Sequence, residues 1–198
     1  MIKMKASLLL IAFAAFIFTG CIMPESNHVE PDFYLLSDVP HDNNASTSPP
    51  EFSFYLREIE LPRYLKDPRM VSRPTPHTIE FRESKRWGEP LEDGIARVIS
   101  LNFQNQVPSS QFSIFPNRRK DALKWDLSIS FSSFEVINDV IVIDSKWSAK
   151  DKSGLFVSGT YSASLPLDRK GGTLGEVKGF NHALYDLTKQ ILEKIPPS

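Results

Sequence analysis

Residues 123–137 read LKWDLSISFSSFEVI, and their alternation decides the fold class. In the first part, apolar side chains take every second position, as in a half-buried β-strand: Leu123, Trp125, Leu127, Ile129 and Phe131. Beyond Ser132 the apolar set moves by one residue to Phe134 and Val136. This change of phase predicts a long strand with a β-bulge or bend near Ser132.

The next two segments predict further strands of a meander. VIVIDSKWSAKD (140–151) and GLFVSGTYSASLPL (154–167) are rich in residues that favour strands. The turns are predicted at NDV (138–140) and at Lys152-Ser153-Gly154. Three consecutive antiparallel strands follow from this order.

Shorter strands are predicted upstream. FSFYLREIEL (52–61) alternates, with a change of phase near Arg57 that predicts a bulge. DFYLLS (32–37), MVSR (70–73), HTIEFRE (77–83) and QFSIFP (111–116) are candidates for brief strands. Prolines at 62, 68, 74 and 76 keep pairing short, because proline lacks the backbone donor of a sheet ladder.

Two segments have helical periodicity instead. One predicted helix covers about residues 88–105, because Pro90 fits only a first helical turn. The other covers about 175–194. Their apolar stripes are Trp87, Leu91, Ile95, Val98 and Ile99 for the first, and Val177, Phe180, Leu184, Leu187 and Ile191 for the second. We therefore predict a single α+β domain, with a mainly antiparallel sheet of about six strands and two amphipathic helices on one face.

The amino terminus has the order of an export signal. Lys3 and Lys5 precede a continuous apolar run at 8–18, and small residues then lead to Cys21, the only cysteine. Such an order is a signal peptide, and the run is shorter than the ~20 apolar residues of a membrane helix. FTGC (18–21) resembles a bacterial lipobox, although Phe18 replaces the usual leucine. The alternative for Cys21 is a small buried hydrophobe at the end of a helix.

The lipobox resemblance implies where the mature chain begins. Cleavage would leave residues 1–20 as a lipoprotein signal peptide, with Cys21 carrying S-diacylglycerol and N-palmitoyl groups. Residues 21–31 would form a lipidated tether and 32–198 the folded domain. Losing two lysines with residues 1–20 would change the formal net charge from −1 to −3. Ile22, in place of an aspartate that retains lipoproteins at the inner membrane of enteric-type bacteria, favours the periplasmic face of the outer membrane.

A search for chemistry predicts no enzyme. The formal net charge of −1 argues against a nucleic-acid-binding surface. No His or Cys spacing of a zinc site, G-x-S-x-G elbow or P-loop occurs, so we predict no catalytic, cofactor-binding or metal-binding residue. Glu89, Glu92 and Asp93 are expected on a solvated helix face, with an acid/base set as the alternative. The glycine-rich RKGGTLGE (169–176) is expected to be an ordinary loop, with an anion site as the alternative.

Several blocks together resemble one family. EIELPRYLKDPRMVSR (58–73), KRWGEPLEDGIARVIS (85–100) and HALYDLTKQI (182–191) follow FYLLS (33–37) in order behind the lipobox. The sequence resembles the ABC-type transport auxiliary lipoproteins, most closely their PqiC (YmbA) branch. The resemblance implies no established catalytic residue. Physically, Trp87 and Leu91 anchor a helix on the sheet.

The resemblance also implies a role and partners. The expected function is that of a non-enzymatic docking subunit of an MCE-type, PqiAB-like lipid transport system that supports envelope integrity. Its partners would be a PqiB-like MCE-domain protein that spans the periplasm and a PqiA-like inner-membrane protein. The chain could also assemble as a homo-oligomeric ring. The alternative is a periplasmic carrier domain that itself binds lipid, and an envelope hydrolase is a third hypothesis.

Overall fold

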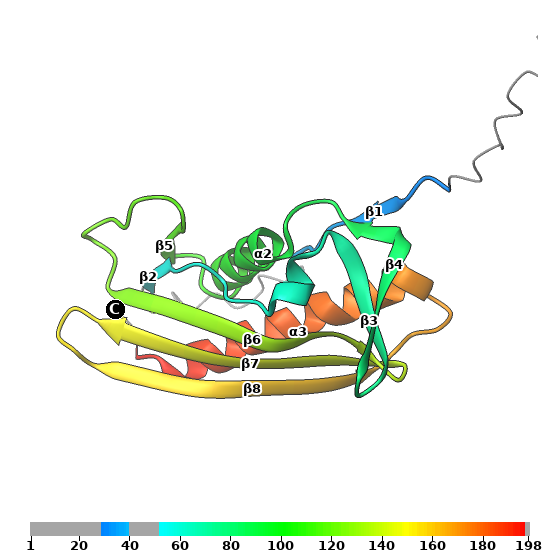
Figure 1. Ribbon diagram of the computed structural model, residues 1–198. Coiled ribbons are helices and arrows are strands. Elements are labelled where there is room, and N and C mark those ends of the chain that lie inside the picture. Colours follow the sequence, from blue (N-terminus) through cyan, green and yellow to red (C-terminus); the bar gives the residue numbers. More distant parts are fainter. Residues whose placement is uncertain (1–28, 40–51, 197–198) are drawn as a thin grey trace, which may run out of the picture. The chain divides into compact units, whose positions relative to one another are not determined.

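The computed structural model describes residues 29–39 and 52–196 (Figure 1). Apart from residues 29 and 30, they belong to one compact unit, Pro31–Ser198. The elements in chain order are β1 (Asp32–Tyr34), β2 (Ser53–Leu56), the 3₁₀ helix η1 (Arg63–Lys66), β3 (Arg69–Thr75), β4 (Thr78–Trp87), α2 (Leu91–Gln106), β5 (Gln111–Ile114), β6 (Trp125–Ile137), β7 (Val140–Asp151), β8 (Phe156–Pro166) and α3 (Gly172–Lys194).

The long strand β6 is the centre of the sheet. Along one edge it pairs antiparallel with β7, which pairs antiparallel with β8. Two short strands share its other edge: β2 lies beside its first residues and β3 beside its last, both parallel to β6. Strand β5 continues the sheet beyond β2, and β4 and β1 continue it beyond β3. The α+β prediction is confirmed.

The sheet has eight described strands where the sequence predicted about six. The difference comes from short pieces such as β1 and β5, which have three and four residues. The long pairings β6–β7 and β7–β8 are antiparallel as predicted, while the short strands add parallel pairs. Pieces of this length carry too little periodicity for a firm prediction from sequence.

Both predicted changes of phase are present. The β6–β7 register shifts between Phe131 and Ser133, which places Ser132 in a bulge. After β2 the chain leaves the ladder at Arg57 and returns as a single bridge between Glu60 and Ser130. Each irregularity allows the apolar residues on both sides of it to reach the same core.

Helices α2 and α3 cover one face of the sheet, as predicted (Figure 1). Phe180 of α3 stacks on Phe134 of β6 with ring centroids 4.4 Å apart, and Phe103 of α2 lies 4.6 Å from Phe54 of β2. All residues of the two predicted apolar stripes are buried. The predicted helix start at about residue 88 was three residues too early, because Pro90 is extended (ψ 130°) and α2 begins at Leu91. Helix α3 begins at Gly172, three residues before the predicted start.

Candidate functional site

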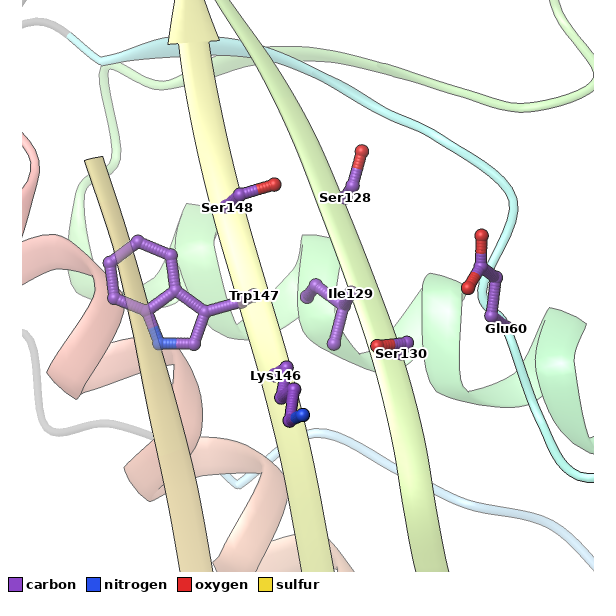
Figure 2. Close-up of a pocket in the computed structure, with 7 residues that line it drawn as sticks. All are labelled: Glu60, Ser128, Ile129, Ser130, Lys146, Trp147 and Ser148. Atoms are coloured by element: carbon purple, nitrogen blue, oxygen red, sulfur yellow. The ribbon is translucent and has the colours of Figure 1, made fainter. Parts of the chain in front are cut away.

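The face of β6 and β7 that turns away from the helices carries short polar side chains. Glu60 is bridged to Ser130, and Ser130 is paired with Lys146, so these three residues lie side by side across the sheet. Ser128 and Ser148 form a parallel row two residues along. Figure 2 shows Glu60 and Lys146 on opposite sides of Ser130. Strand alternation brings these residues to one surface.

Between the two long charged side chains lies an open hollow of about 260 Å³. It is hollow because serines stand between Glu60 and Lys146, while Ile129 and Trp147 are buried in the core. Pockets for small molecules typically have volumes of ~300–1,000 Å³ and largely apolar walls. A hollow of this size, with a carboxylate, an ammonium group and hydroxyls, suits polar contact with another surface better than enclosure of a ligand.

The hollow places serines beside one carboxylate and one ammonium group, with no described histidine among them. A serine nucleophile needs a general base within hydrogen-bond reach. The described histidines, His77 and His182, do not line the hollow. Within residues 29–39 and 52–196, no group of three or more His, Cys, Asp or Glu side chains could hold a metal ion. That the chain lacks catalytic and cofactor residues stays a prediction.

A second polar cluster is buried near the end of β6. The Arg73 guanidinium of β3 lies 2.9 Å from Glu135 Oε1, and the Tyr64 hydroxyl of η1 donates to the same oxygen at 3.1 Å. Arg73 Nη2 also donates to the Tyr64 oxygen at 3.1 Å. Glu135 is fully buried (0% exposed). The cluster therefore ties η1 and β3 to the central strand.

Burial raises the pKa of the Glu135 carboxyl, against the opposing effects of the Tyr64 hydrogen bond and the Arg73 charge. Burial also raises the pKa of Tyr64, and the neighbouring Glu135 carboxylate adds to the effect. Sequence reasoning did not identify this cluster. The sequence feature that could have indicated the cluster is the carboxylate of Glu135 between the apolar residues Phe134 and Val136, because a buried charge requires partners.

The segment after β1 is fastened to both helices. Leu36 is buried (3% exposed), and its carbonyl accepts a hydrogen bond from Arg97 of α2 at 3.0 Å. The Ser37 backbone N–H donates to Asn181 Oδ1 of α3 at 3.0 Å, and Asn181 Nδ2 donates to the Ser37 hydroxyl at 3.0 Å. Asn102 Oδ1 of α2 accepts from the Val39 backbone at 3.3 Å. These bonds fix the segment that follows β1 to the helix layer.

The residues singled out from sequence are placed as follows. Cys21 and the boundary after residue 20 lie outside the described residues, so lipidation and signal-peptide cleavage stay predictions. Trp87 and Leu91 are buried, and the Trp87 ring lies 6.1 Å from that of Phe180, which fits a helix anchor.

Two members of the alternative acid/base set have structural partners. Glu89 is ion-paired with Arg97, and Glu92 lies 3.8 Å from Lys66. The glycine-rich segment divides between a turn and the start of α3, where Gly172 has a φ of 55° and the Gly175 N–H donates to Gly171 O at 3.1 Å. Neither feature points to a ligand.

No helix among the described residues combines the length and the apolar character needed to cross a membrane.

Comparisons with known proteins give a family and a fold. A family model described as "ABC-type transport auxiliary lipoprotein component" matches residues 34–192, which is more than half of the chain. A search of curated proteins gave no match.

Two solved structures resemble this one. A crystal structure of an uncharacterized protein has a TM-score of 0.67 at 15% identity, over 83% of this chain and 98% of that one. Protein XCC0632 from Xanthomonas campestris, of family DUF330, has a TM-score of 0.66 at 16% identity, over 81% of this chain and 92% of that one. At such identities the likeness establishes the fold alone.

Proposed function

The chain belongs to the ABC-type transport auxiliary lipoprotein component family, and from this premise we propose that it is a non-enzymatic docking subunit held at the outer membrane. The single observation that carries the proposal is the family match, which runs from β1 to the last turns of α3. An auxiliary component acts through its partners, and the polar hollow suits contact better than catalysis.

We propose that the anchor is the acylated Cys21 on the tether 21–31. The lipobox-like FTGC supports acylation, and Ile22 supports sorting to the outer membrane. More than one acyl chain is needed for stable anchoring, which a triacylated cysteine would supply. The bonds from Leu36, Ser37 and Val39 to α2 and α3 suit a domain that must keep its position against a pulling tether.

We propose a PqiB-like MCE-domain protein as the periplasm-spanning partner and a PqiA-like protein in the inner membrane. The face with Glu60 and Lys146 is the contact surface we favour, because α2 and α3 already cover the other face of β6 and β7. A hydroxyl-rich surface with two opposite charges fits a polar, wet interface.

The test is purification of the tagged, acylated protein from native membranes. We expect an MCE-domain protein to co-purify, and its absence would contradict the proposed partnership. Lys146→Glu should reduce the recovered partner. The matched control is Lys189→Glu, which makes the same change on the exposed face of α3 and should leave recovery unaltered.

The carrier alternative has a separate test. Three hollows formed by described residues have volumes of about 230–330 Å³ and polar groups in their walls, and none of these three favours an enclosed lipid. Native mass spectrometry of the purified protein distinguishes the two ideas. One phospholipid bound per chain, beyond the acyl groups on Cys21, would favour a carrier over a docking subunit.

A further inference from the structure

Strand β1 and the two residues after it carry apolar side chains on both faces. Leu36 is buried, and Tyr34 packs against the core. Alternation directs Phe33 and Leu35 to the opposite face, where they are 65% and 56% exposed. A sheet face in contact with water usually carries polar residues. Two large apolar side chains on this face therefore indicate a contact surface.

The two exposed side chains are held in place by the sheet. The β1–β4 ladder pairs Phe33 with Arg86, and the Gly88 N–H donates to Tyr34 O at 2.8 Å. A Cβ at Gly88 would lie 3.1 Å from Leu35 Cδ2, so the Leu35 side chain rests against this glycine. Phe33 and Leu35 therefore form part of an ordered surface.

The charged groups beside this surface suit a phosphate-bearing partner. Directly opposite residues of a sheet point to the same face, so Arg86 lies beside Phe33. No hydrogen bond or ion pair joins the Arg86 guanidinium to another described residue. Asp32, the acidic residue of β1, lies on the other face and is ion-paired with Lys85 at 2.5 Å. An arginine next to apolar side chains matches a lipid surface, because a guanidinium binds phosphate oxygens at two points.

The position of β1 along the chain favours a membrane as the occupant. Asp32 follows Cys21 by eleven residues, and a fully extended chain of this length spans at most ~40 Å. β1 is the first described strand after the proposed acylation site. Figure 1 shows β1 at the end of the molecule opposite the turn between β7 and β8. The proposed anchor would therefore hold the β1 end within reach of the bilayer.

We propose that Phe33 and Leu35 contact the bilayer surface directly, with Arg86 at the level of the lipid phosphates. The proposal rests on the acylated Cys21 of the proposed function and adds a second contact, made by the domain itself. Apolar side chains enter the boundary between headgroups and acyl chains by ~5–10 Å, and binding strengthens with the apolar area buried. Two side chains give a weak contact, which the anchor makes persistent by keeping the domain close to the surface.

Tryptophan fluorescence of the full acylated chain tests the contact. The protein is reconstituted into phosphatidylethanolamine–phosphatidylglycerol vesicles whose acyl chains carry bromine, which quenches nearby tryptophan. Phe33→Trp should add emission that is shifted to the blue and quenched by the brominated lipid. The three native tryptophans are buried, and the wild type corrects for their emission.

The matched control for this measurement is Phe156→Trp. Phe156 is 61% exposed and lies at the start of β8, at the opposite end of the molecule (Figure 1). Its added emission should not be quenched. An unquenched Phe33→Trp variant, or equal quenching of the two variants, would overturn the proposal.

A Cys21→Ser background separates this contact from the anchor. Phe33→Ser/Leu35→Ser should weaken the binding of the unacylated protein to the same vesicles about tenfold or more, because it removes the apolar area that enters the bilayer. The matched control Leu155→Ser/Phe156→Ser changes side chains that are 47% and 61% exposed and should bind like the parent. Equal vesicle affinities of the two double variants would contradict the proposed surface.

The two proposals fail in different ways. A wild type that does not float with the vesicles would contradict the acylated anchor of the proposed function. The Cys21→Ser series would still decide whether Phe33 and Leu35 contact the bilayer.

Discussion

At Gly159 the addition of a side chain would disturb the packing of the core. A Cβ at this position would lie 2.9 Å from Cε2 and Cζ2 of the buried Trp147 ring. Gly159→Ala should lower the free energy of unfolding by ~1–3 kcal/mol, because overpacking forces the ring or the strand to shift. Chemical denaturation measures the change. The neighbour Ser158 faces outward, and Ser158→Ala should stay within ~0.5 kcal/mol of the wild type.

The raised pKa of Glu135 predicts an unusual pH dependence of the protein's stability. Because its pKa in the fold is raised above the ordinary 4.5, the folded state holds the proton more tightly than the unfolded chain. The stability contribution of Glu135 is therefore fully present below pH 4.5 and is lost as the pH rises through the raised pKa.

Comparison with Glu135→Gln isolates this contribution. Denaturation curves at a series of pH values should show the wild type gaining stability relative to Glu135→Gln as the pH falls toward 4.5. The contribution of Asp67 to the pH dependence of stability has the opposite sign, because hydrogen bonds from Arg69 lower its pKa to about 2. Its effect is common to both proteins and cancels. A difference between the two proteins that does not vary with pH would show that the Glu135 pKa is unshifted.

At the scale of single residues, the sequence predicts which side chains are buried but not which side chains they contact. Alternation identified Trp125, Leu127 and Ile129 as inward residues, and all are buried. It could not pair Glu135 with Tyr64 and Arg73, because they lie more than sixty residues away along the chain. Likewise, Glu60 and Lys146 meet at one hollow only because a single bridge brings Glu60 beside β6.

At the scale of elements, one ion pair fastens the β3–β4 hairpin to α3. Arg82 of β4 binds the Glu176 carboxylate with both terminal nitrogens, at 2.9 and 2.5 Å. Glu176 is 3% exposed. Arg82→Met should therefore cost ~3–5 kcal/mol of unfolding free energy, since a buried carboxylate would remain without its partner.

The surface pair Arg169–Asp139 provides a matched control. Its side chains are 75% and 58% exposed, so Arg169→Met should cost only ~0–1 kcal/mol. The double variant Arg82→Met/Glu176→Met should recover much of the loss, because it leaves no uncompensated charge. Equal effects of Arg82→Met and Arg169→Met in urea denaturation would rule out the structural role of the buried pair.

Elements with strong periodicity were predictable, and those made by distant pairing were not. Helix α3 and strands β6 to β8 follow from their repeats of 3.6 and two residues. The division of one β6 edge between β2 and β3 depends on parallel pairings that leave no local pattern. The start of α2 depended on the conformation of Pro90, which fits either the first helical turn or the position before it.

At the scale of the whole molecule, the proposed anchor can be tested independently of the folded domain. Residues 1–28 lie outside the described structure, and the domain core is built from residues 36 onward. Cys21→Ser should therefore release the protein from the membrane fraction without changing the melting temperature of the domain. The physical reason is that acyl chains supply membrane affinity, while buried apolar area supplies fold stability.

Membrane fractionation and calorimetry on the same preparations decide this last prediction. Leu36→Ala is the complementary variant, because it leaves Cys21 intact and truncates a buried side chain at the first fastened segment. It should keep membrane association but lower unfolding free energy by ~2–5 kcal/mol. A Cys21→Ser protein that stays with the outer membrane as strongly as wild type would mean that the lipobox interpretation is wrong, whatever the domain binds.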